Sequence, residues 1–159
     1  MYILVIGLNH RTAPVEIREK LSFTVSTLPK ALKRLREKPQ VEGCAIISTC
    51  NRSEVYIATA DMEIAADGVL KFLSDSCGKP VTILRNYLYT HSLYDGVRHL
   101  FRVAAGLDSM ILGETQILGQ VREAYDIAKE AGVTNSIINT LFQQAITVGK
   151  KVRTETLID

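Results

Sequence analysis

The sequence lacks most of the short motifs that assign a chain to a large enzyme class. It has no GxGxxG and no GxxxxGK[ST] pattern, so neither a dinucleotide site nor a Walker-type phosphate site can be placed. HExxH is absent, and the cysteines and histidines do not have the spacing of a zinc site. The third predicted strand carries no RNP1 pattern of the RNA-recognition type.

Cysteine is scarce and long apolar runs are missing. Cys44, Cys50 and Cys77 are an odd number without the spacing of a disulfide framework, which favours reduced thiols. The apolar start at residues 1–8 has no basic region before it, and Asn9 ends it too soon for a signal peptide or a membrane span. We therefore expect a cytoplasmic protein that has no contact with a membrane.

The composition is that of a globular protein. Of 159 residues, 47% are hydrophobic and 23% charged, and the formal net charge of +2 is too small to indicate nucleic-acid binding by itself. The basic run at residues 30–38 is expected to be a solvated helix face.

The apolar pattern predicts an α+β fold. A ferredoxin-like, split β-α-β arrangement is expected over residues 1–90, with helices on one face of an antiparallel sheet. Thr27 is expected to cap the second helix. Strands are predicted at 2–8, 44–48, 54–59 and 81–89, and helices at 14–21, 28–35 and 62–76.

Residues 91–159 form a second, all-helical part in this prediction. Helices are expected at 92–105 and 114–131, and Thr134 is expected to cap a third. No glycine or proline ends the last helix before Asp159, so we expect a chain cut near a linker or inside a longer helix.

Cys50 is the strongest candidate for chemistry. Cys44 lies inside an apolar run, where cysteine is usually a small buried hydrophobe, and Cys77 near a helix end is also expected to be structural. Cys50 has only polar neighbours and lies between two predicted strands, where a side chain can face a cleft. Arg52 supplies positive charge nearby, and N–H groups of the turn can stabilise a thiolate or an oxyanion.

His99 is the best candidate for proton transfer. It falls outside the apolar stripe predicted for its helix, beside Asp95, Arg98 and Arg102. An exposed histidine without a role is the alternative. His10 is a weaker candidate that follows the first strand, and His91 is expected at a helix start.

Polar residues interrupt the helical part between its first two helices. Gln116 and Gln120 share one helix face and, with Ser109, can form a set of hydrogen-bonding groups. The alternative is an ordinary capped turn followed by surface glutamines.

Three segments together resemble one family. Residues 7–15, GLNHRTAPV, are similar to its opening motif, and residues 48–56, STCNRSEVY, to the segment that holds its nucleophile. Residues 99–114, HLFRVAAGLDSMILGE, are similar to its longest signature. The family is glutamyl-tRNA reductase, which commits glutamate to tetrapyrrole synthesis by way of 5-aminolevulinate.

The resemblance implies a two-step reaction. Cys50 attacks the ester of glutamyl-tRNA and forms a thioester, and NADPH reduces it to glutamate-1-semialdehyde. His99 contributes to activity, and Arg52 can bind the substrate carboxylate bidentately. Substrate-binding positions are Thr49, Asn51, Arg52, Ser109, Glu114, Thr115, Gln116 and Gln120.

The resemblance also implies partners and a cofactor. An NADPH domain and a dimerising helical domain are expected beyond this chain, which has no NADPH site and no metal of its own. The full enzyme is expected to be a homodimer that hands its product to glutamate-1-semialdehyde aminomutase. The alternative functions are a ferredoxin-like module that binds a metabolite or RNA, with an incidental Cys50, and a helical interaction domain without a site.

Overall fold

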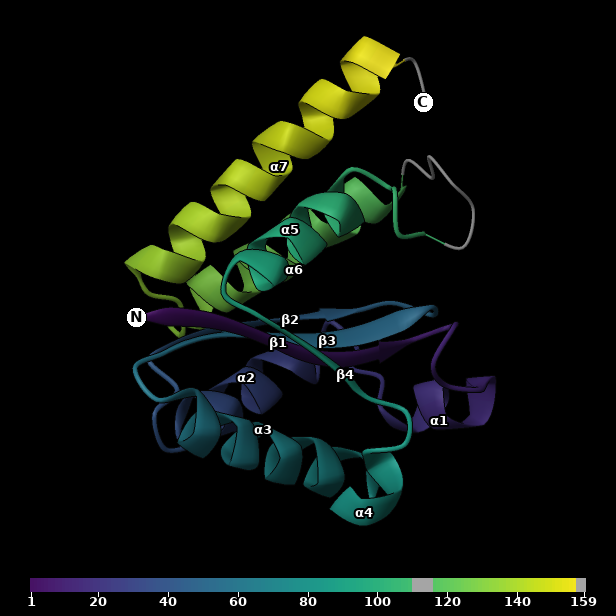
Figure 1. Ribbon diagram of the computed structural model, residues 1–159, viewed down its shortest axis with the longest axis vertical. Coiled ribbons are helices and arrows are strands. Elements are labelled where there is room, and N and C mark those ends of the chain that lie inside the picture. Colours follow the sequence, from purple (N-terminus) through teal and green to yellow (C-terminus); the bar gives the residue numbers. More distant parts are fainter. Residues whose placement is uncertain (110–115, 157–159) are drawn as a thin grey trace.

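The computed structural model describes residues 1–109 and 116–156, which form three layers (Figure 1). The middle layer is a four-stranded antiparallel sheet in the order β2-β3-β1-β4. Its strands are β1 (Tyr2–Asn9), β2 (Gly43–Ser48), β3 (Arg52–Thr59) and β4 (Tyr89–Ser92).

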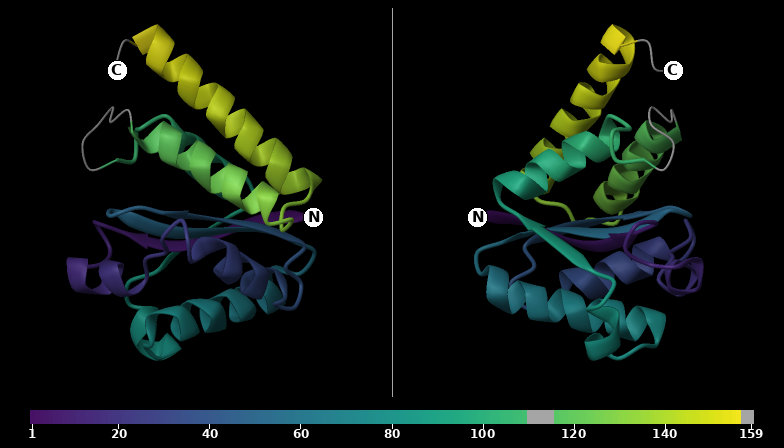
Figure 2. Two further views of the ribbon diagram at one scale, coloured as in Figure 1. Left: turned by 180° about the vertical axis from the view of Figure 1, so that it is seen from behind. Right: turned by 45° about the vertical axis from the view of Figure 1, so that its right-hand side comes forward.

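Helices cover both faces of the sheet, as the two views of Figure 2 also show. One face is covered by α2 (Leu28–Arg36) and α3 (Met62–Cys77), with the short helices α1 (Val15–Lys20) and α4 (Val81–Leu84) toward one end. The other face is covered by α5 (Tyr94–Ala104), α6 (Gln116–Glu130) and α7 (Ser136–Thr156).

The predicted α+β class and the β-α-β-β-α-β order are confirmed. The helices between the strands lie on one face as expected, and the helices that follow the sheet cover the second face. Every residue of β3 is therefore buried. A strand buried on both faces reads as a continuous apolar run, which is why the predicted strands do not alternate.

The predicted strand at residues 81–89 is wrong. Residues 81–84 form α4, and the fourth strand is β4, which pairs with β1 from Leu4 opposite Ser92 to Gly7 opposite Tyr89. Pro80 precedes α4 with the fixed φ that suits a helix start, and only Leu84 of this helix is buried. A strand must pair with the edge of a neighbouring strand, and residues 89–92 are the ones that lie beside β1.

Two other helix starts differ from the prediction. Asn135, not Thr134, caps α7, because its Oδ1 accepts a hydrogen bond of 3.0 Å from the Ile138 N–H. His91 lies in β4, since α5 begins only at Tyr94. Thr27 precedes α2 as expected, but its side chain makes no capping hydrogen bond to that helix.

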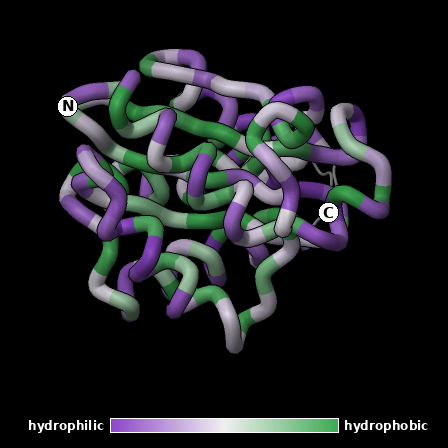
Figure 3. The backbone as a smooth tube through the Cα atoms, turned by 90° about the horizontal axis from the view of Figure 1, so that it is seen from below, coloured by the Kyte–Doolittle hydropathy of each residue, from purple (hydrophilic) through white to green (hydrophobic). Residues whose placement is uncertain are grey.

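One hydrophobic core continues through the sheet layer. Buried residues of residues 1–90 and of residues 91–159 belong to the same cluster, and Tyr56 of β3 meets the Phe142 ring of α7 edge-on at 5.4 Å. Figure 3 shows hydrophobic and hydrophilic stretches alternating along the chain, as amphipathic helices require. Within the described residues, no helix is both long and apolar enough to cross a membrane.

Candidate functional site

Cys50 lies at the tip of the tight connection between β2 and β3. The Thr49 N–H donates to the Arg52 carbonyl at 2.8 Å, and the Asn51 N–H donates to Thr49 Oγ1 at 3.1 Å. Arg18 of α1 donates from Nε to the Cys50 carbonyl at 3.3 Å. These contacts fix the backbone of the turn, and the Cys50 residue is exposed.

The turn and the start of α6 enclose a small pocket around Cys50. Its space is about 40 Å³. Ser109 contributes a buried Oγ that has no hydrogen-bond partner among the described residues. The lining is Thr49, Cys50, Asn51, Arg52, Ser109, Gln116, Ile117 and Gln120. The structure thus brings together seven of the ten predicted site residues, while Glu114 and Thr115 lie outside the described residues.

Arg52 is buried within an ion cluster, with 2% of its side chain exposed. Its Nη1 lies 3.3 Å from Glu54 Oε2 and 3.0 Å from Asp108 Oδ2, and its Nη2 donates to the Asp108 carbonyl at 2.6 Å. Burial opposes the charge, but the surrounding acidic groups, Glu54 first, outweigh it and raise the pKa of Arg52. Of its five N–H donors, the described residues occupy three.

Glu54 is the centre of this cluster and is fully buried on β3. It accepts hydrogen bonds from Tyr56 at 2.8 Å and Tyr89 at 2.5 Å, and a short one joins it to Nε2 of His99. Burial favours the neutral acid, but the hydrogen bond and charge of His99, then Arg52 and Tyr89, outweigh it and lower the pKa of Glu54 to about 2. Glu54 is therefore an anion at neutral pH.

Gly7 makes room for Glu54 in the sheet. The two residues are paired across β1 and β3. A Cβ at Gly7 would lie 2.6 Å from the Ser53 carbonyl oxygen and 2.8 Å from Glu54 Cγ, closer than such atoms approach in proteins. The glycine thus allows a charged side chain to sit within a closely packed strand pair.

His99 is buried, contrary to the prediction that it faces away from the packed side of its helix. The buried side of α5 is formed by Gly96, His99, Leu100, Val103 and Ala104, whereas Leu93, counted in the predicted stripe, is exposed. The ring tolerates burial because Glu54 is its partner. Since that carboxylate accepts the hydrogen bond, Nε2 of His99 is the donor.

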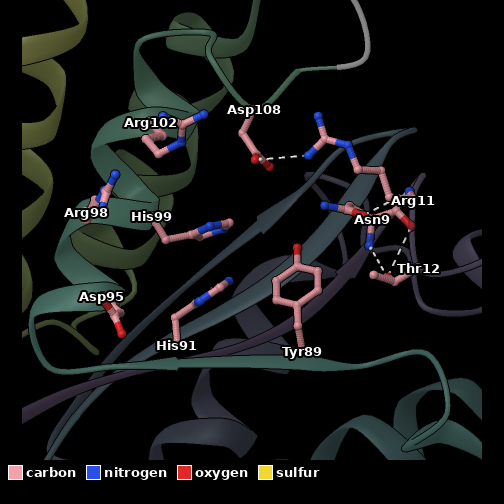
Figure 4. Close-up of a pocket in the computed structure, with 10 residues that line it drawn as sticks. All are labelled: Asn9, Arg11, Thr12, Tyr89, His91, Asp95, Arg98, His99, Arg102 and Asp108. Atoms are coloured by element: carbon pink, nitrogen blue, oxygen red, sulfur yellow. Dashed lines mark hydrogen bonds and ion pairs between the residues drawn. The ribbon is translucent and has the colours of Figure 1, made fainter.

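His99 lines a second and larger pocket, not the one that contains Cys50 (Figure 4). The two pockets meet at Asp108, which lines the second pocket and bonds Arg52 of the first. Figure 4 shows His99, His91 and Tyr89 gathered on one side, with Arg11 and its ion pair to Asp108 on the other. The space of this second pocket is about 450 Å³.

A family model described as "Glutamyl-tRNAGlu reductase, N-terminal domain" matches residues 6–156. The chain belongs to this glutamyl-tRNA reductase family. The glutamyl-tRNA reductase of Pelotomaculum thermopropionicum is 64% identical over the whole chain, which covers 36% of that protein. That of Carboxydothermus hydrogenoformans is 57% identical, with 35% of it covered.

A solved structure agrees with the family. The glutamyl-tRNA reductase from Methanopyrus kandleri is 31% identical, with a TM-score of 0.75 over 96% of this chain and 34% of that one. The chain thus spans about a third of the length of the glutamyl-tRNA reductases that it matches. Within the part that the structure describes, no cluster of three or more His, Cys, Asp or Glu side chains could hold a metal ion.

Sequence reasoning missed the buried residues that join the two pockets in this family member. Glu54, Tyr89 and Asp108 were not among the predicted site residues, although together they bond both Arg52 and His99. A signal was present for Glu54, because an acidic residue inside a predicted buried strand needs a partner. No pattern pointed to Tyr89, which the wrong strand boundaries placed at the end of a strand.

Proposed function

We propose that the protein carries out the acyl-transfer step of glutamyl-tRNA reductase. Cys50 attacks the ester carbonyl of glutamyl-tRNA, a carbon–sulfur bond forms, the bond to the ribose oxygen breaks, and the tRNA leaves. The observation that supports this most is an exposed cysteine at a fixed turn, in a pocket lined otherwise mainly by polar groups. The Ser109 hydroxyl in that pocket has no hydrogen-bond partner in the part of the chain that the structure describes and is available to a substrate.

Arg52 is the proposed binding partner of the glutamyl side-chain carboxylate. Its position is fixed by Glu54 and Asp108, the described residues leave two of its N–H donors without a partner, and Arg52 lines the Cys50 pocket. Gln116 and Gln120 are exposed and offer amide oxygens to the substrate ammonium group. Their rotation can widen the pocket around a bound glutamyl group.

The oxyanion of the tetrahedral intermediate needs donors near Cys50. The Thr49 and Asn51 amides already donate within the turn, so the Cys50 N–H is the amide of the tip that remains, together with the Ser109 hydroxyl. His99 is proposed to transfer a proton to the leaving oxygen of the tRNA and not to act on the Cys50 thiol. Its ring lies in the neighbouring pocket and not in that of Cys50.

The second step is proposed to use NADPH, which supplies a hydride to the thioester. The residues of this chain do not fit that cofactor, because the sequence has no dinucleotide-binding glycine motif. We therefore propose that this chain forms the thioester without reducing it and hydrolyses it slowly. A homodimer of the full enzyme and transfer of its product to an aminomutase are proposals that rest on the family alone.

The test is to incubate the protein with glutamyl-tRNA carrying radiolabelled glutamate, without NADPH. Label should become bound to the protein and be released by hydroxylamine, as a thioester requires. Cys50→Ser should carry no label, while Cys77→Ser, which changes a half-buried thiol on α3, should label normally. Label that persists in Cys50→Ser, or its absence from the unmodified protein, refutes the proposed function.

A further inference from the structure

The pocket next to that of Cys50 has no role in the function proposed so far beyond His99. Its space of about 450 Å³ lies within the roughly 300–1,000 Å³ typical of small-molecule sites. The two pockets share a wall, since Asp108 lines this one and the next residue, Ser109, lines the other.

Aromatic rings form one side of this pocket. The His91 and His99 rings are stacked with centroids 4.4 Å apart and an interplanar angle of 20°, and Tyr89 lies 5.3 Å from His91. Burial first, and then the charge of His99, lower the pKa of His91, which is therefore neutral at pH 7. The lining thus offers flat ring surface, to which a nucleobase can stack.

Three arginines also line the pocket, together with Asp95 and Asp108. Arg98 and Arg102 lie one turn apart on α5, and neither side chain has an ion pair or a hydrogen bond within residues 1–109 and 116–156. Arg11 stands across the pocket and is 57% exposed, although it shares Asp108 with Arg52. Cations without partners beside aromatic rings are the combination that binds single-stranded nucleic acid.

We propose that this pocket binds the 3′-terminal nucleotide of the aminoacyl-tRNA, with its base against the His91–His99 stack and a phosphate at Arg98 and Arg102. The inference rests on the proposed function, because the ester links the glutamyl group to the ribose of that nucleotide. While the carbonyl lies at Cys50, the nucleoside must lie next to it. The Cys50 pocket is about 40 Å³ and the adjoining pocket about 450 Å³, so the adjoining pocket is the better match for a nucleoside.

The first test compares two acyl donors, glutamyl-tRNA and the small ester glutamate α-ethyl ester. In Arg98→Ala/Arg102→Ala, the ratio of the acylation efficiencies, tRNA over small ester, should fall on the order of tenfold. The salt dependence of the tRNA reaction should weaken by about one unit of log–log slope. Lys71→Ala/Arg85→Ala, which removes two exposed cations from α3 and the end of α4, should keep the ratio. Equal loss with both donors, or an unchanged ratio, overturns the inference.

The second test uses no catalysis. Adenosine 5′-monophosphate added to the protein should shift the ring-proton NMR signals of His91 and His99 upfield, and nicotinamide mononucleotide should shift them less. An absent shift, or a larger one with the nicotinamide compound, overturns the inference. If no glutamyl adduct forms on Cys50 in any assay, the proposed function fails, and the response to the adenosine compound still decides whether the pocket binds a nucleotide.

Discussion

Cys44 and Cys50 stand close together in the chain but in opposite environments. Cys44 on β2 is fully buried, and burial raises the pKa of its thiol to about 12. Cys50 is exposed at the hairpin tip. The two thiols therefore differ in solvent access, and this difference supports a functional role for Cys50 and a structural role for Cys44. It arises because β2 ends at Ser48, before Cys50.

Iodoacetamide should alkylate Cys50 first in the folded protein at pH 7.5. Cys44 should stay unmodified until the protein unfolds, since alkylation requires an accessible thiolate. Peptide mapping by mass spectrometry over a time course measures all three thiols at once. Cys77, which is half-buried at the end of α3, is the internal control, and its modification as fast as that of Cys50 would contradict an activated nucleophile.

Glu54 should stabilise the folded protein only while it is ionised. Glu54→Gln leaves the buried Arg52 without one of its anionic partners, and truncating one side of such a pair costs roughly 3–5 kcal/mol. Urea unfolding at pH 7 measures the loss. Glu63→Gln, an exposed glutamate of α3, is the matched control and should change the free energy of unfolding by less than about 0.5 kcal/mol.

The same residue gives a pH dependence with a definite sign. The folded-state pKa of Glu54, about 2, lies below the ordinary value of 4.5 for a glutamate. Its contribution is therefore fully present above about pH 4.5 and is lost as the pH falls from there toward 2. Urea unfolding at pH 6 and pH 3 should show a smaller decrease for Glu54→Gln than for the unmodified protein. Equal decreases would show that other carboxylates dominate acid unfolding.

At the scale of elements, helix α7 packs against α5 and α6 at a glycine. A Cβ on Gly149 would lie 2.7 Å from the Ala104 carbonyl oxygen and 2.9 Å from Leu118 Cδ1. Gly119 in α6 has open space at the same position. The two helical glycines thus serve different purposes, since only Gly149 permits a close approach of helices.

Gly149→Ala should destabilise the protein by roughly 1–3 kcal/mol, because the backbone of α5 cannot yield to the added methyl group. Gly119→Ala should instead stabilise it by about 0.5–1 kcal/mol, the gain in helix propensity alone. Thermal unfolding followed by circular dichroism measures both. If both substitutions changed the stability in the same direction, α7 would not pack on α5 as closely as described.

At the scale of the whole molecule, the sheet is shared between the two parts of the chain. Residues 1–90 supply the strands except the end of β4, and α5–α7 bury the face that α2 and α3 leave open. We propose that 1–90 and 91–159 are subdomains of a single folding unit. The sites agree with this, because Arg52 comes from one part and Asp108 from the other.

Unfolding should accordingly be a single cooperative transition. Far-UV circular dichroism reports mainly the helices, and tyrosine fluorescence reports all six tyrosines, most of which lie in residues 1–90, so the two urea midpoints should coincide. Midpoints separated by more than the experimental error would show that the helical part unfolds independently and would reverse the single-unit proposal.

The order of the elements, the first three strands and the polar turn at Cys50 were determined by the sequence alone. Each depends on local information: apolar runs, glycine and proline at element ends, and polar residues between two strands. Around Cys50, local patterns indicated Cys50 itself, Arg52, Gln116 and Gln120, whereas Thr49 and Asn51 were expected only from the resemblance to the family.

Only the tertiary structure decided which polar residues are buried together. Glu54 lies on β3, His99 on α5 and Asp108 in the turn after α5, and the apolar stripe predicted for α5 gave the wrong face for His99. The physical reason is that a buried charge is stabilised by partners distant in sequence, whose positions depend on how α5 rests on β1 and β4. The separation of Cys50 and His99 into adjoining pockets follows from that packing and from no local pattern.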